Sequence, residues 1–189
     1  MKNAGFLNLI LIAAVAAGSA CKKKEAAAPD EQKALQRTIT ATVKADKIDP
    51  GYTRKSTYFR LPNAAGGEID LAAYAGKPVL VMFFTETCPY CREAAPFLEK
   101  LHRTYSPKGL NVIGICVQEN ADAPKAFASD LGLTFLFAYK GGYISRNYKA
   151  QGVPFIYLLD RNHEIYEMWG GYSPDFDSEI IENIEKVLK

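Results

Sequence analysis

Two cysteines, Cys88 and Cys91, mark the junction between two segments of different pattern, and no other feature constrains the fold as much. Residues 78–84, before the pair, are continuously apolar and predict a buried strand. Residues 92–105, after the pair, carry apolar side chains at helical spacing and predict a helix. The chain must therefore pass from a buried strand into a helix at the cysteines.

The two cysteines have the spacing of a reversible dithiol. Because Cys88 precedes the helix, the first free backbone N–H groups of the helix should point at its sulfur atom. These N–H groups and the helix dipole favour a thiolate, which is the form of cysteine that attacks disulfides. We predict that Cys88 attacks a substrate disulfide and that Cys91 resolves the mixed disulfide.

Two other interpretations of the pair are a structural disulfide and half of a zinc site. A structural zinc site usually has four ligands, and the remaining candidates show no ligand spacing: Cys21, His102, Cys116 and His163. A structural disulfide that closes so small a ring would remove little chain entropy. We therefore expect a redox-active pair, no metal and no other cofactor. Cys116 lies in an apolar run and should be buried, whereas both histidines should lie at the surface.

Residues 1–20 have the pattern of an export signal. Lys2 is followed by an apolar stretch over residues 5–17 and by small residues up to Cys21. This end resembles a bacterial lipobox, in which the cysteine is lipidated and becomes the first residue of the mature chain, although Gly18 stands where Leu is usual. An ordinary signal peptidase site, with a soluble periplasmic product, is the alternative. We expect a lipoprotein-type signal peptide.

Residues 21–50 are predicted to be a lipid anchor and a flexible tether, because their first half is rich in alanine and charged residues. The lysines at 22–24 either contact anionic headgroups or are solvated. Residues 35–43 fit a strand or a helix. Without residues 1–20 the chain has 22 basic and 21 acidic side chains, a balance that implies no nucleic-acid partner.

Residues 51–189 form the predicted domain, and 48% hydrophobic residues suffice for one core. Strands and helices alternate, and a hairpin and a helix follow, so we expect an α/β fold with a mixed sheet covered on both faces. The predicted elements are a hairpin at 58–61 and 68–71, strands at 78–84, 110–117 and 134–139, helices ending near 105, at 123–131 and near 143–149, a hairpin at 155–159 and 164–169, and a helix at 175–188.

Residues 58–188 resemble the membrane-anchored thioredoxin-like proteins of the TlpA and ResA type, within the redoxin group. The resemblance rests on Gly-Lys-Pro at 76–78, Cys-Pro-Tyr-Cys at 88–91 and Gly-Val-Pro at 152–154. It implies a thioredoxin fold, with a central mixed β-sheet flanked by helices and an added N-terminal β-hairpin.

The resemblance also implies the roles of several residues. Pro154 would be the cis-proline of the family, beside the cysteines and in contact with the incoming substrate. The implied site consists of catalytic Cys88 and Cys91 with the supporting and substrate-binding residues Pro89, Tyr90, Val153 and Pro154.

This sequence departs from the family pattern at two acidic positions. The buried acid of thioredoxin, before the motif, is replaced by Met82, and the family's acid after the second cysteine is replaced by Ala94. Proton transfer must therefore use another group, and the candidates are Glu86, Glu93, Tyr90 or water.

The predicted function is that of a thiol-disulfide oxidoreductase in the bacterial cell envelope, lipid-anchored through Cys21 and facing the periplasm. The sequence does not distinguish the inner from the outer membrane. The resemblance implies a reductase for protein disulfides, in cytochrome c maturation or envelope redox homeostasis, recharged by a membrane or periplasmic thiol donor. One alternative is a thiol peroxidase of the redoxin group, which is disfavoured because Val81 replaces the proline of the peroxide pocket. The other is a non-catalytic binding or sensor domain.

Overall fold

The structure is a computed structural model and describes residues 51–189. The predicted signal peptide, the predicted lipidation site Cys21 and the predicted tether, with its undecided segment at 35–43, all lie outside the described residues. Within residues 51–189, no helix combines the length and the apolar character that crossing a bilayer requires.

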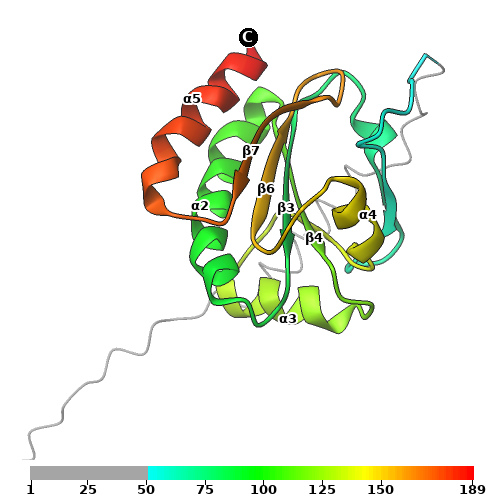
Figure 1. Cartoon of the computed structure of the whole chain (residues 1–189), viewed down its shortest axis with the longest axis vertical. Coiled ribbons are helices and arrows are strands. Elements are labelled where there is room, and N and C mark those ends of the chain that lie inside the picture. The colour runs from blue at the N-terminus through cyan, green and yellow to red at the C-terminus, as the bar shows by residue number, and fades with distance from the viewer. Residues whose placement is uncertain (1–50) are drawn as a thin grey trace, which may run out of the picture.

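A five-stranded mixed sheet forms the centre of the domain, with the strand order β5-β4-β3-β6-β7 (Figure 1). β3 pairs in parallel with β4 and antiparallel with β6, so the middle strand joins the parallel half to the antiparallel half. The strands are β3 (Val79–Phe84), β4 (Asn111–Cys116), β5 (Leu136–Ala138), β6 (Phe155–Leu159) and β7 (Ile165–Gly170).

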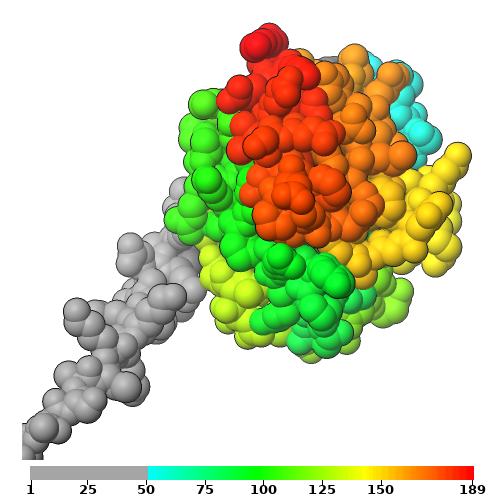
Figure 2. Space-filling model, turned by 60° about the vertical axis from the view of Figure 1, so that its left-hand side comes forward, coloured from blue at the N-terminus to red at the C-terminus, as the bar shows by residue number. Residues whose placement is uncertain are grey.

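Helices cover both faces of this sheet, as predicted. α2 (Pro89–Tyr105) and α5 (Asp177–Leu188) lie on one face, and Figure 2 shows their surfaces side by side. α4 (Gly142–Asn147) lies toward the other face, and α3 (Asp122–Leu131) lies near the end of the sheet where α2 begins (Figure 1).

The side chains of β3 explain this two-sided cover. All six are fully buried, and successive side chains of a strand point to opposite faces. The side chains toward α2 and α5 are Leu80, Met82 and Phe84, and those toward α4 are Val79, Val81 and Phe83. A strand that is apolar on both faces must lie in the middle of a covered sheet.

The predicted N-terminal hairpin is present as a separate two-stranded sheet. It consists of β1 (Arg60–Pro62) and β2 (Glu68–Asp70), which pair antiparallel. Asn63 forms a bridge with Ala138, so the hairpin adjoins the edge strand β5. A 3₁₀ turn (Leu71–Tyr74) then leads to β3.

The remaining helical segments are short. A 3₁₀ turn (Ser106–Lys108) follows α2, and another (Pro174–Phe176) occupies the start of the helix predicted at 175–188. The strand predicted at 134–139 is shorter than expected, because only its central residues pair with β4.

The prediction that His163 lies at the surface is wrong. The side chain is fully buried in the turn between β6 and β7. Its Nε2 lies 3.1 Å from the carbonyl oxygen of Tyr74 and 3.2 Å from that of Lys77, while its Nδ1 lies 2.8 Å from the Tyr52 hydroxyl. Since carbonyl oxygens only accept, Nε2 carries the proton and Nδ1 accepts from Tyr52.

The burial of His163 predicts a pH dependence of stability. Burial lowers the pKa of His163 from its ordinary value of 6.5, so the unfolded chain binds a proton that the folded chain does not. The free energy of unfolding should therefore be full above about pH 6.5 and fall as the pH drops below it. Urea denaturation between pH 5 and pH 8 measures this slope.

The control is the His163→Asn variant, because asparagine tolerates the positive φ of 59° at this position. This variant should be less stable at pH 8 and should lose part of the slope. It keeps the part due to His102, whose pKa burial also lowers. An unchanged slope in His163→Asn would contradict the assignment.

Candidate active site at the strand–helix junction

The cysteine pair lies where β3 ends and α2 begins. Cys88 is the N-cap of α2, with extended backbone angles (φ −68°, ψ 115°), and Pro89 is the first helical residue. Proline suits that position, because its missing N–H is one that a helix start leaves unpaired. The predicted transition from buried strand to helix is confirmed.

The two cysteines form a disulfide, and their Cα atoms lie 5.2 Å apart. The backbone N–H of Cys91 donates to Cys88 Sγ at 3.2 Å. Cys91 is fully buried, whereas 9% of the Cys88 surface is exposed. After reduction, the same N–H group can stabilise a negative charge on Cys88 Sγ, which belongs to the less buried of the two cysteines.

The loop before β6 completes one side of the site. The Val153–Pro154 peptide bond is cis, as the resemblance implied. The carbonyl oxygen of Val153 lies 3.6 Å from Cys88 Sγ. Pro89 and Tyr90 lie on the outer side of the disulfide, where Tyr90 is 62% exposed. The structure thus places Val153 against the sulfur and leaves Tyr90 facing solvent.

Two residues that the sequence analysis missed hold the loop before Cys88. The backbone N–H of Glu86 donates to Gln118 Oε1 at 2.9 Å, and the backbone carbonyl of Glu86 accepts from Arg92 Nη1 at 3.4 Å. Arg92 Nη2 also pairs with Asp130 in α3 at 3.1 Å. Both backbone groups of Glu86 are therefore fixed by side chains from other elements.

Cys116 is buried at the end of β4, as predicted. Burial raises the pKa of its thiol, so Cys116 stays protonated at neutral pH. Its Sγ lies 3.5 Å from Gln118 Oε1. Cys116 is thus a packed, unreactive thiol. It contacts the side chain of Gln118, which also holds the active-site loop.

The predicted absence of a nearby buried acid agrees with the packing. Met82 and Ala94 are fully buried among apolar side chains. Of the candidate proton carriers, Glu86 is partly exposed, and Glu93 and Tyr90 are exposed. Among residues 51–189, no three His, Cys, Asp or Glu side chains are grouped in a way that could hold a metal ion.

Residues 53–184 match the family described as the AhpC/TSA family. The chain belongs to the AhpC/TSA family. This match covers the β-hairpin, the whole five-stranded sheet and most of α5.

Among curated proteins of this family type, the chain is similar to thiol-disulfide oxidoreductases named ResA. The ResA of Bacillus thuringiensis subsp. konkukian is 26% identical over 147 residues, which are 77% of this chain and 80% of that protein. The ResA of Halalkalibacterium halodurans is 27% identical over 154 residues, which are 80% of this chain and 88% of that protein. The resemblance to proteins of the TlpA and ResA type is confirmed.

Solved structures show the same fold. A thiol:disulfide interchange protein of the thioredoxin family from Chlorobium tepidum gives a TM-score of 0.62 at 20% identity, over 70% of this chain and 94% of that one. A secreted Mycobacterium tuberculosis disulfide oxidoreductase homologous to E. coli DsbE gives 0.61 at 20% identity, over 71% and 99%. The AhpC/TSA chain therefore has the predicted thioredoxin fold. With the Cys88–Cys91 disulfide and the ResA relatives, it is a thiol-disulfide oxidoreductase.

The geometry of this AhpC/TSA site predicts which thiol reacts first. In the reduced full chain, iodoacetamide should label Cys88 before Cys91, because Cys88 is less buried than Cys91 and its Sγ receives the Cys91 N–H. Cys116 is the internal control, since burial and its raised pKa should protect it until the protein unfolds. Peptide mass spectrometry over time measures all three. Earlier labelling of Cys91 would reverse the roles of the two cysteines.

Proposed function

We propose that this chain is a membrane-tethered disulfide reductase that faces the periplasm and uses Cys88 as its nucleophile. The observation that carries the proposal is the unequal environment of the two sulfurs. Cys88 keeps 9% of its surface exposed and its Sγ accepts the Cys91 N–H, whereas Cys91 is fully buried. A dithiol that must first attack an outside disulfide and then close on itself needs this inequality.

The proposed reaction has two exchange steps. The Cys88 thiolate attacks one sulfur of the substrate disulfide, and the other substrate sulfur leaves as a thiolate that takes up a proton. Cys91 then loses its proton and attacks Cys88 Sγ, which breaks the mixed disulfide and releases the second substrate sulfur. The substrate gains two electrons, and the enzyme ends with the Cys88–Cys91 disulfide.

The supporting residues position the substrate chain and take no part in the exchange of disulfides. The Val153 carbonyl faces Cys88 Sγ, so a substrate segment that runs past Val153 and Pro154 would bring its own sulfur next to the nucleophile. Tyr90, which follows Pro89 between the two cysteines, offers an exposed ring. Glu86, Glu93, Tyr90 and water remain the candidates for proton transfer.

The direction and location belong to the same proposal. A membrane or periplasmic thiol donor would reduce the Cys88–Cys91 disulfide and restore the enzyme, and the export-signal pattern of residues 1–20 supports a role in the cell envelope. Lipidation at Cys21 would hold the enzyme at the membrane, and the following lysines would add attraction to anionic headgroups. The substrates include cytochrome c precursors or other envelope proteins with disulfides.

Disulfide exchange with a protein substrate tests the reaction. The full chain should reduce insulin in the presence of a dithiol, and Cys88→Ser should lower the rate to that of the uncatalysed reaction. Cys91→Ser should instead accumulate mixed disulfides through Cys88, because the second step is lost. Cys116→Ala is the matched control and should keep the wild-type rate. Consumption of hydrogen peroxide without insulin reduction would favour the peroxidase alternative.

Substitution of the proposed lipidation site tests the tether. Cys21→Ala should move the protein from the membrane fraction to the soluble fraction, because a single lipid would be its main attachment. Insulin reduction in vitro should stay at the wild-type rate, since Cys21 lies well outside the domain. Fractionation of cells that express each protein measures the change. A variant that stays with the membrane would refute lipidation at Cys21.

A further inference from the structure

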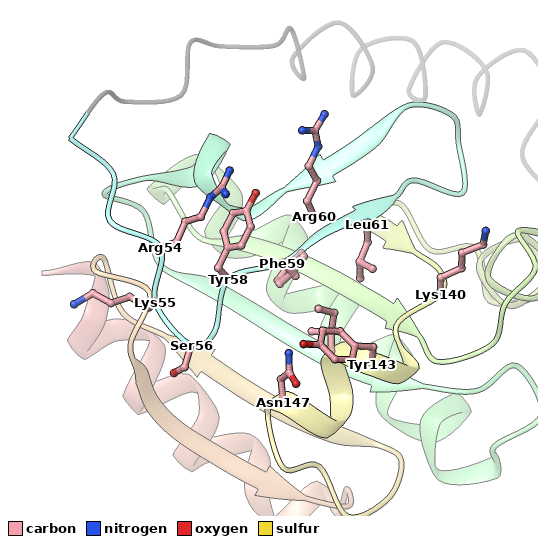
Figure 3. A pocket seen from close by; sticks show the side chains of 11 residues that line it. Arg54, Lys55, Ser56, Tyr58, Phe59, Arg60, Leu61, Lys140, Tyr143 and Asn147 are labelled. Carbon is pink, nitrogen blue, oxygen red and sulfur yellow. The ribbon is translucent and has the colours of Figure 1, made fainter.

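A hollow of about 490 Å³ lies on the same face of the sheet as α4, away from α2 and α5. Figure 3 shows it between the segment that leads into β1 and α4, with Arg54 and Lys140 on opposite sides. Its lining consists of Arg54, Lys55, Ser56, Tyr58, Phe59, Arg60, Leu61, Lys140, Tyr143, Ile144 and Asn147.

The lining contains four cationic side chains and no acidic one. Two of the four cations already have carboxylate partners outside the hollow. Lys55 Nζ lies 2.9 Å from Glu164, and Arg60 pairs with Glu68. Each of these ion pairs has no net charge, so the net positive charge of the lining comes from the other two cations.

The other two cations, Arg54 and Lys140, have no carboxylate partner within residues 51–189. The Arg54 guanidinium lies 4.5 Å from the centre of the Tyr58 ring, and the Tyr58 hydroxyl donates to Asp70 at 3.2 Å. No ion pair joins Asp70 to Arg54. Two uncompensated positive charges therefore lie on opposite sides of one hollow.

The lining also contains polar side chains that make no hydrogen bond within residues 51–189. Among the described residues, Ser56, Tyr143 and Asn147 have no side-chain hydrogen-bond partner. Tyr143 is 64% exposed. All three can donate to an oxygen atom of a ligand. The hollow thus offers positive charge and free donors together, which suits an anionic group.

Gln118 connects Lys140, in the lining of the hollow, to the active-site loop. The Lys140 N–H donates to the Gln118 carbonyl at 2.8 Å, and Gln118 Oε1 accepts the Glu86 N–H at 2.9 Å. Glu86 stands two residues before Cys88. Lys140, on one side of the hollow, is therefore linked to the active-site loop by two hydrogen bonds through Gln118.

We propose that this hollow docks an acidic stretch of the protein whose disulfide Cys88 attacks. The inference rests on the proposed function, because its occupant is the substrate. Aspartate or glutamate side chains of the substrate pair with Arg54 and Lys140, and substrate oxygens accept from Ser56, Tyr143 and Asn147. Charge complementarity raises the rate of encounter more than the rate of exchange. The substrate class is thus a protein with acidic residues near its disulfide.

Two peptides of equal length test the proposal. Each carries one internal disulfide, and they differ only in a flank of aspartates or of serines. The full chain should reduce the aspartate peptide with a kcat/KM about tenfold higher at low salt. This preference should shrink at 0.3 M NaCl, because salt screens the attraction. The double variant R54Q/K140Q should lose the preference, so that it reduces the two peptides with equal kcat/KM.

The double variant K100Q/K125Q is the matched control for charge, because Lys100 on α2 and Lys125 on α3 are exposed and lie outside the hollow. It should retain the preference. Equal kcat/KM for the two peptides in the wild type, or a preference that survives in R54Q/K140Q, would overturn the docking site. Loss of binding to phosphatidylglycerol vesicles in R54Q/K140Q, without any peptide preference in the wild type, would assign the hollow to lipid headgroups and overturn it as well.

Peptide binding separates this inference from the proposed function. Fluorescence anisotropy with the full-length Cys88→Ser variant measures affinity for both peptides without any exchange. Tighter binding of the aspartate peptide, lost when R54Q/K140Q is added, supports docking even if neither peptide is reduced. Failure of reduction alone would refute the reductase proposal, and equal affinities would refute the docking site.

Discussion

The hydrogen bond from the Cys91 N–H to Cys88 Sγ is the interaction on which the chemistry of this domain depends. It exists only because the chain leaves a buried strand and enters a helix within a few residues, with Cys88 as the helix cap. The same turn buries Cys91 completely and leaves 9% of the Cys88 surface exposed. Strand burial, helix start and unequal thiols are therefore consequences of one local geometry.

The sheet fixes that geometry in space. β3 is covered on both faces, so its end cannot shift without disturbing two sets of packed side chains. Gln118 and Arg92 then hold the backbone N–H and the backbone carbonyl of Glu86, respectively. The Val153 carbonyl contacts Cys88 Sγ. The position of the nucleophile is thus set by residues that are distant in sequence.

The sequence predicted the parts of the fold that arise from local pattern. The apolar run before Cys88, the helix after it and the alternation of elements each follow from periodicity, so the mixed sheet and the cysteine pair could be expected. The roles of Gln118 and His163 could not, because each depends on contacts across 32 to 111 positions. A lone histidine in a polar turn gives no sign that Tyr52 will cover it.

The hydrogen bond between Tyr52 and His163 also has a mechanical consequence. His163 lies in the turn after β6, and β6 runs antiparallel to β3, so this turn is at the end of the sheet opposite to Cys88. Lys55 and Glu164 reinforce the same contact. Any force that reaches the domain through Tyr52 is therefore applied at the end of the sheet opposite to the disulfide. A tether that joined the domain at this end would leave the opposite end of the sheet, with Cys88, free to meet its partners.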